Sequence, residues 1–274
     1  MADSRMMLGL AVVTWCGAAA PLVAQAPSGS RAGPVWTITG LRTGQCVRFL
    51  LDPAVARRAL PGGARLLPAS GDETLHPALR SVIDGQPEFA AWTPSSLCFF
   101  YADVLDLGGR RFRSKDPRKR RMIGAWTVAA SEQGSGARQD VVMELFGISG
   151  GLVQAAAYAK VKLSEAQSLV SKVEGSDNDL YDVKIGKTRL SWNGRAVGDS
   201  TRVGQPIHES WLTKGTAGMV WRVDVTLQPE WSRPLVGALS VAGDDELAQA
   251  LKASPIRFVG PLYRGGGAEL RFSR

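Results

Sequence analysis

RTGQCVRFLLDPAVARRALPGGARLLPA, residues 42–69, is the stretch from which the fold is most readily predicted. Residues 45–52 alternate in the manner of a strand. A short helix is expected to follow, because Asp52 is a good N-cap residue and Pro53 is a good first helical residue. Residues 61–69 end this helix and start another extended segment. The stretch therefore predicts a strand, a short helix and a second strand in close succession.

The rest of the chain continues this pattern of short strands with a few short helices. Strands are predicted at residues 35–41, 96–107, 122–130, 219–228, 234–243, 256–262 and 268–274. Helices are predicted at residues 76–83, 137–147, 164–173 and 244–253. Residues 180–197 predict strands with tight turns at Gly186–Lys187 and Asn193–Gly194. With no internal repeat, the pattern indicates a mainly β single domain, most simply a barrel or a curved, packed sheet.

The positive charge of the chain is concentrated in one segment. The chain has 274 residues and a formal net charge of +8. Residues 110–121, RRFRSKDPRKRR, hold eight cationic side chains and one anionic side chain, so the remainder is close to neutral. Nucleic-acid-binding proteins usually spread basic residues over a face, and Phe112 is the only aromatic residue here, so nucleic acid is not an expected partner. We expect an exposed hairpin loop, either simply solvated or a patch for an anionic lipid, glycan or polyphosphate.

The N-terminus has the pattern of a secretory signal peptide over residues 1–26. Arg5 supplies the positive region, residues 6–20 are apolar, and residues 24–26 offer small side chains for cleavage. A membrane anchor is the alternative, but the apolar stretch is short and is broken by Pro21. We therefore expect an exported chain, periplasmic or secreted.

After the signal peptide, residues 27–34 read as a Pro/Gly/Ser linker and residues 35–274 as one domain. Removal of the signal leaves Cys46 and Cys98. An oxidising compartment makes a disulfide between them plausible, and two buried free thiols are the alternative. His76 and His208 add no metal-ligand spacing, so neither a metal nor a cofactor is expected.

Three stretches in order resemble the acetoacetate decarboxylase family: residues 42–69, ELFGISGG at 144–151, and SPIRFVGPLYRGGGAELRFSR at 254–274. The resemblance spans about residues 41–274. It implies a cone-shaped, mostly antiparallel β-barrel with an enclosed apolar pocket. In the family, a lysine in that pocket forms a Schiff base with a β-keto acid, and the iminium acts as an electron sink while carbon dioxide leaves. An arginine and a glutamate complete the family's site.

The resemblance assigns three candidate site residues. Arg42 matches the family's arginine, ten residues before the aspartate that starts the helix. Asp103 lies where the family has a strand glutamate and is one methylene shorter. Glu144 opens the second matching stretch. In the alternative interpretation Arg42 is a rim residue of a turn, and Asp103 is an outward-facing strand residue.

The family's lysine is missing at its expected place. The second stretch puts Gly150 at the lysine position, and glycine carries no nucleophile. Lys160 and Lys162 follow on the next predicted extended segment, where they would share one face. Each either points into the pocket as a relocated lysine or faces solvent, as strand lysines usually do.

Three functions follow, in order of preference. The first is an exported, non-catalytic barrel that holds a small apolar or carboxylate-bearing ligand. The second is a carbon–carbon lyase acting on a keto acid through a relocated lysine. The third is a lipocalin-like carrier, although Trp36 lacks the glycine spacing of that family. Residues 147–151 match Gly-x-Ser-x-Gly around Ser149, but no α/β alternation surrounds them, so a serine hydrolase is not expected.

Overall fold

The structure is a computed structural model in which residues 32–274 form one compact unit. It describes residues 36–41, 43–102, 104–107, 110–113, 121–132, 136–147, 156–157, 160–172, 178–215, 218–260, 262–264 and 266–273. The expected signal peptide and linker, residues 1–34, lie outside the described residues. Among the helices described, none has the length and apolar character needed to cross a membrane.

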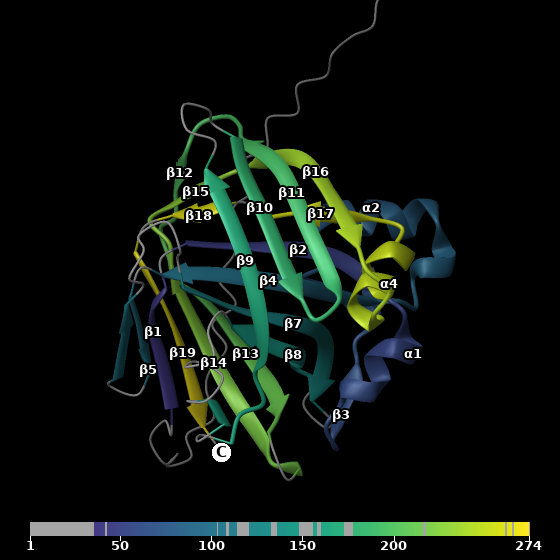
Figure 1. Cartoon of the computed structure of the whole chain (residues 1–274). Helices are drawn as coiled ribbons and strands as arrows, with labels where there is room; N and C mark the ends of the chain where they lie inside the picture. Colours follow the sequence, from purple (N-terminus) through teal and green to yellow (C-terminus); the bar gives the residue numbers. More distant parts are fainter. Residues whose placement is uncertain are drawn as a thin grey trace, which may run out of the picture. The chain divides into compact units, whose positions relative to one another are not determined.

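The larger sheet is a long ladder of mostly antiparallel strands (Figure 1). In order of pairing its strands are β6 (Arg110–Arg113), β5 (Val104–Leu107), β1 (Trp36–Leu41), β19 (Gly267–Ser273), β14 (Val220–Gln228), β13 (Ile207–Lys214), β8 (Arg138–Gly147), β7 (Arg121–Glu132), β4 (Thr93–Ala102) and β2 (Thr43–Leu51). The pair β13–β8 is parallel. Short strands flank the ladder: β3 (Ala64–Leu66), β12 (Thr201–Arg202), β15 (Trp231–Arg233), β17 (Arg257–Val259) and β18 (Leu262–Arg264).

Four further strands form a second, antiparallel sheet and run side by side in Figure 1. They are β9 (Ser164–Lys172), β10 (Asn178–Ile185), β11 (Thr188–Ala196) and β16 (Leu235–Ala242), paired in that order. The start of β9 also pairs in parallel with the end of β8, through Phe146 and Ser164. This contact joins the two sheets.

The helices are short and begin with side-chain caps. They are α1 (Pro53–Ala56), α2 (Pro77–Gly85) and α4 (Glu246–Ala253), with 3₁₀ turns η1 (Arg57–Ala59), η2 (Ala69–Gly71) and η3 (Pro87–Phe89). Asp52 accepts a hydrogen bond from the Ala54 N–H at 2.7 Å, which confirms the predicted cap. His76 caps α2 through Nδ1 and stacks on Phe258, with ring centroids 4.5 Å apart. This histidine therefore has a structural role.

The alternation of β2 distributes its side chains between separate core clusters. Val47, Phe49 and Leu51 join a cluster shared by the two sheets and α4, which includes Trp126 and Trp192. Cys46, on the opposite face, packs against a second cluster, to which β1, β4, β7, β8, β13, β14 and β19 all contribute. A third cluster lies under α2. The larger sheet is therefore covered on one face by the second sheet, and its other face carries an apolar cluster of its own.

Two predicted helices are strands. Residues 137–147 contain the whole of β8, and residues 164–173 contain the whole of β9. Both segments carry helix-forming residues, but each lies between strands that offer complete hydrogen-bonding edges, β7 for β8 and β10 for β9. Local helix propensity is worth only tenths of a kcal/mol per residue, so long-range pairing overrides it.

The two predicted turns had different outcomes. Gly186 and Lys187 form the two-residue turn between β10 and β11, with Gly186 at φ +57°, which confirms the prediction. Asn193 and Gly194 instead lie inside β11 and pair with β10 and β16. A side chain at Gly194 would meet the Trp192 ring at 2.2 Å, so this glycine is needed for packing rather than for a turn.

The basic segment is not a simple hairpin loop. β4 and β7 pair directly with each other, as expected of the strands on either side. The first four residues of the segment form β6, however, which pairs with β5. The prediction of a loop beginning at Arg110 was therefore wrong, because this part of the segment finds a strand partner. Residues 114–120 lie outside the described residues.

The mainly β fold class is confirmed. No pairing among the described strands joins the ends of the ladder into a closed ring, so the cone-shaped barrel stays a prediction. Cys46 and Cys98 lie directly opposite each other on β2 and β4 and form a disulfide, with Cα atoms 4.0 Å apart. This confirms the expected pairing of the two cysteines.

Candidate functional site

A bulge in β8 shapes the site. Trp126 of β7 lies opposite Glu144, whereas the next residue, Thr127, lies opposite Val142, so Met143 is an extra residue in β8. A bulge bends its strand and redirects the neighbouring side chains. As a result, four consecutive β8 residues, from Val142 to Leu145, line one pocket.

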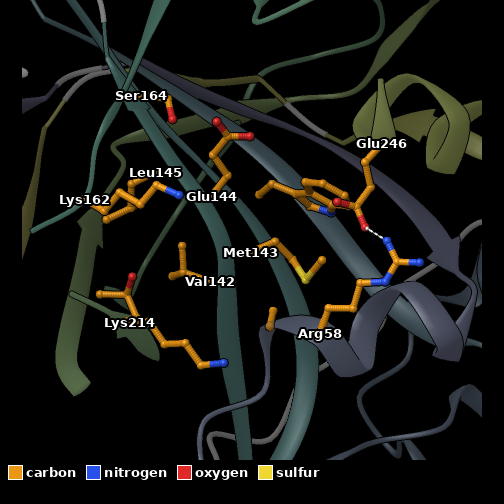
Figure 2. A pocket seen from close by; sticks show the side chains of 12 residues that line it. Arg58, Val142, Met143, Glu144, Leu145, Lys162, Ser164, Lys214 and Glu246 are labelled. Carbon is orange, nitrogen blue, oxygen red and sulfur yellow. Dashed lines mark hydrogen bonds and ion pairs between the residues drawn. The ribbon is translucent and has the colours of Figure 1, made fainter. Parts of the chain in front are cut away.

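This pocket has a volume of about 360 Å³, within the usual range for small-molecule sites. Its lining comes from six parts of the chain. The residues are Arg58, Ala59, Trp126, Val142, Met143, Glu144, Leu145, Lys162, Ser164, Thr213, Lys214 and Glu246. Figure 2 shows Glu144 between the lysine side of the pocket and the side formed by η1 and α4.

The charged side chains of the pocket are of two kinds. Arg58 and Glu246 pair with each other at 3.0 Å across η1 and α4, and both are exposed. The side chains of Lys162, Lys214 and Glu144 make no hydrogen bond or ion pair with any other described residue. Two ammonium groups and one half-buried carboxylate, none of them paired with a described side chain, therefore line the pocket beside an apolar wall. This arrangement suits a small molecule with an apolar body and an anionic group.

The structure brings two of the predicted site residues together. Glu144 from β8 and Lys162 from the segment before β9 both line the pocket, although they lie far apart in sequence. Lys160 is not among the lining residues and occupies a turn at φ +60°. The expectation that Lys160 and Lys162 share one strand face was wrong, because neither residue is in a strand.

Three other positions of the sequence analysis cannot be placed. Arg42, Asp103 and Gly150 lie outside the described residues. The sequence analysis in turn did not identify Arg58, Lys214 or Glu246. Each reaches the pocket through long-range packing, and none carried a local motif by which it could be found.

A second group of charged side chains lies near the start of β8. Arg138 pairs with the buried carboxylate of Asp72 and donates to Thr74 Oγ1 at 2.6 Å. It also lies 3.5 Å from Asp140, which accepts from Thr127 at 3.4 Å. These contacts tie β8 to the loop before α2.

Burial raises the pKa of Asp140 above its usual value, while the charge of Arg138 and the hydrogen bond from Thr127 oppose this effect. Asp72 adds to the increase, and the charge of Arg48 opposes it. The neutral form of Asp140 is therefore favoured by its surroundings relative to an exposed aspartate.

We expect the stability difference between the Asp140→Asn variant and the parent chain to grow in favour of the variant as pH rises from about 4 to about 8. The folded-state pKa of Asp140 is raised, so its proton is held to higher pH in the folded chain than in the unfolded chain, and the parent loses stability across that interval. Asparagine does not titrate. Urea unfolding at several pH values measures the difference.

Asp182→Asn is the matched control. The hydrogen bond from Arg189 lowers the pKa of Asp182, so its contribution is present above the usual aspartate pKa and is lost as pH falls through the folded value. Between pH 4 and pH 8 this control should therefore show little change, and its difference from the parent chain should move in the opposite direction only as the pH falls below the usual aspartate pKa. A pH-independent difference for Asp140→Asn would contradict the assignment.

Comparison with known proteins supports the fold. Neither a family model nor a curated protein matches the sequence. Among solved structures, acetoacetate decarboxylase from Legionella pneumophila is similar with a TM-score of 0.51 and 12% identity, over 89% of this chain and 87% of that chain. A second acetoacetate decarboxylase structure has a TM-score of 0.50 and 10% identity, over 89% of this chain and 88% of that chain. At this level of identity the likeness shows the fold alone.

Proposed function

Starting from the acetoacetate decarboxylase-like fold of this chain, we propose that it is an exported protein that holds a small carboxylate-bearing ligand without Schiff-base catalysis. The observation that carries the proposal is the pocket in which Lys162 and Lys214, without a partner among the described side chains, lie beside an apolar wall. The N-terminal signal pattern supports export. In full, the proposed molecule is a β-barrel that binds its ligand in this pocket.

The charges of the pocket favour a monoanion. Arg58 and Glu246 neutralise each other in their ion pair. The remaining charged lining residues are two lysines, Lys162 and Lys214, and one glutamate, Glu144, so the pocket has a net charge of +1. Lysine binds carboxylates as a flexible point charge, and the apolar side chains of β8 would cover the remainder of the ligand.

Two features argue against catalysis by the family's mechanism. The family's lysine position is Gly150, which has no amine. Lys162 does line the pocket, but its side chain is exposed to solvent, whereas the mechanism uses an amine desolvated in an apolar site or held beside another cation. Lys214 supplies a second cation in the same pocket, so a relocated lysine, with Lys162 as the nucleophile, is the alternative function.

We expect butyrate to bind measurably in isothermal titration calorimetry and neutral butyramide to bind at least about tenfold more weakly, because a charge-assisted contact is worth about 1.5–3 kcal/mol. Lys162→Ala and Lys214→Ala should each weaken butyrate binding by a similar factor. Glu144→Gln should strengthen it by removing a repulsive charge. Lys160→Ala is the control and should leave the affinity unchanged, because Lys160 does not line the pocket.

Borohydride trapping with acetoacetate separates the two functions. The ligand-holding function predicts no amine-linked adduct in the peptide mass spectrum. A stoichiometric adduct on Lys162 that disappears in Lys162→Ala would overturn it in favour of the lyase. Equal affinities for butyrate and butyramide would contradict the proposed role of the two lysines.

A further inference from the structure

Glu144 has no partner among the described side chains of the pocket. The lining includes one other carboxylate, that of Glu246, which accepts a hydrogen bond from Arg58 at 3.0 Å. The side chain of Glu144 makes no such bond with any described residue. Because Glu144 is half-buried, water compensates its charge less completely than at an exposed position. A half-buried acceptor without a donor is a group that a bound ligand can satisfy.

The donor nearest to Glu144 along the sheet serves another acceptor. Trp126 of β7 lies directly opposite Glu144, so the two side chains share a face. The single N–H of the Trp126 indole donates to Ser95 Oγ at 3.0 Å, which leaves no donor for Glu144. The lining also includes Lys162 and Lys214, which are the proposed binders of the ligand's carboxylate. A donor for Glu144 is therefore left for the ligand itself to provide.

Glu144 and the two lysines are held in different ways. Glu144 belongs to β8 and pairs with β7, so the sheet fixes its position beside the bulge at Met143. Lys162 precedes β9 and Lys214 is the last residue of β13, and both are exposed. Figure 2 shows Glu144 between the lysine side of the pocket and the side formed by η1 and α4. A ligand whose carboxylate lies at the lysines would therefore extend toward Glu144.

We propose that the ligand of this pocket is a hydroxycarboxylic acid, whose carboxylate lies at the lysines and whose hydroxyl donates a hydrogen bond to Glu144. The inference rests on the proposed function and adds a second polar contact to it. The ligand's carboxylate balances the net charge of the lining, which is +1 outside the pair of Arg58 and Glu246. A hydroxyl supplies the missing donor without changing this balance, whereas an ammonium group would bring a further positive charge beside Lys162 and Lys214.

Isothermal titration calorimetry at neutral pH with matched pairs of acids tests the proposal. The pairs are propionate and 3-hydroxypropionate, butyrate and 4-hydroxybutyrate, and valerate and 5-hydroxyvalerate, because chain length decides whether the hydroxyl reaches Glu144. In at least one pair the hydroxy acid should bind the parent chain at least about tenfold more tightly than the unsubstituted acid, since hydrogen bonds to charged groups are the stronger ones.

Glu144→Met removes the acceptor and keeps a side chain of similar length. This variant should reverse the preference, because a hydroxyl that finds no acceptor in an apolar site loses its hydration without compensation. Glu144→Gln keeps a neutral acceptor and should retain a smaller preference for the hydroxy acid. The matched control is Glu165→Met, the same substitution at an exposed position of β9 outside the pocket lining. It should keep the preference of the parent chain.

Thermal unfolding followed by circular dichroism establishes that each variant is folded. If the parent chain binds the unsubstituted acids, then equal or weaker binding of every hydroxy acid overturns this inference alone. A preference that survives in Glu144→Met, or that is lost equally in Glu165→Met, also overturns it. Tighter binding of the matched ω-amino acid than of the hydroxy acid would assign the Glu144 contact to an ammonium group instead. A parent chain that binds none of the acids would contradict the proposed function and this inference with it.

Discussion

Replacing Arg138 with alanine is expected to lower the free energy of unfolding by about 3–5 kcal/mol. The reason is Asp72, whose side chain is only 1% exposed and pairs with Arg138 through Oδ2. The other carboxylate oxygen, Oδ1, accepts from the Thr74 N–H at 2.9 Å and from the Thr74 hydroxyl at 2.8 Å. The variant would leave Oδ2 as an uncompensated buried charge, and removing one partner of a buried pair is far more costly than removing both.

Solvent reduces this effect toward the lower end of the range. The Arg138 side chain is 35% exposed, so water can enter the space that the guanidinium leaves. Urea unfolding at neutral pH measures the loss, and the midpoint should fall without a change in the slope. Arg138→Lys should lose less than Arg138→Ala, because it keeps a positive charge near Asp72 while losing the fork of donors.

Two further variants make the explanation testable. Arg138→Met combined with Asp72→Asn removes both charges and should recover a large part of the stability. Arg189→Ala breaks an ion pair with Asp182 at the surface and should change the stability little. If the double variant were as unstable as Arg138→Ala, the loss would come from packing rather than from the buried charge of Asp72.

Features set by neighbouring residues could be predicted from the sequence. The cap of α1 depends on Asp52 and the residue two positions later, and the turn at Gly186 depends on a glycine that adopts positive φ. The alternation along β2 and β14 also fixed which residues share a face. Each of these signals lies within a few residues, so no knowledge of distant strands was needed.

Features set by distant residues could not be predicted in the same way. β8 was expected to be helical because residues 137–147 carry helix-forming residues, and the pairing with β7 that overrides this propensity cannot be read from that stretch alone. Gly194 was predicted to be a turn residue, although its role is to make room for the Trp192 ring.

The residues of the candidate site show the same difference between local and long-range signals. Glu144 was identified through a family resemblance, whereas Lys214 is brought to the pocket by the parallel pairing of β13 with β8, which no local pattern indicates.

Loss of the disulfide is expected to have the second large effect on stability, about 2–4 kcal/mol. Cys46 and Cys98 are 52 positions apart in sequence, and their bond joins β2 to β4 at directly opposite positions. A cross-link of this span restricts the unfolded chain, which is the main reason for its stabilising effect. We expect the variant with both Cys46→Ala and Cys98→Ala to fold, because the β2–β4 ladder and the adjacent apolar cluster remain.

Urea unfolding with and without dithiothreitol measures the effect of the disulfide on stability and tests whether it depends on oxidising conditions. The reductant should lower the midpoint of the parent chain to that of the double variant and leave the double variant unchanged. Each single variant should lose about as much stability as the double variant, because either substitution breaks the same bond. Replacing Cys98, which is 5% exposed, should add a small further loss because the shorter side chain leaves a cavity. A parent chain insensitive to the reductant would show that the bond does not form in solution. It would also remove one reason to place the folded chain in an oxidising compartment, where such a bond persists.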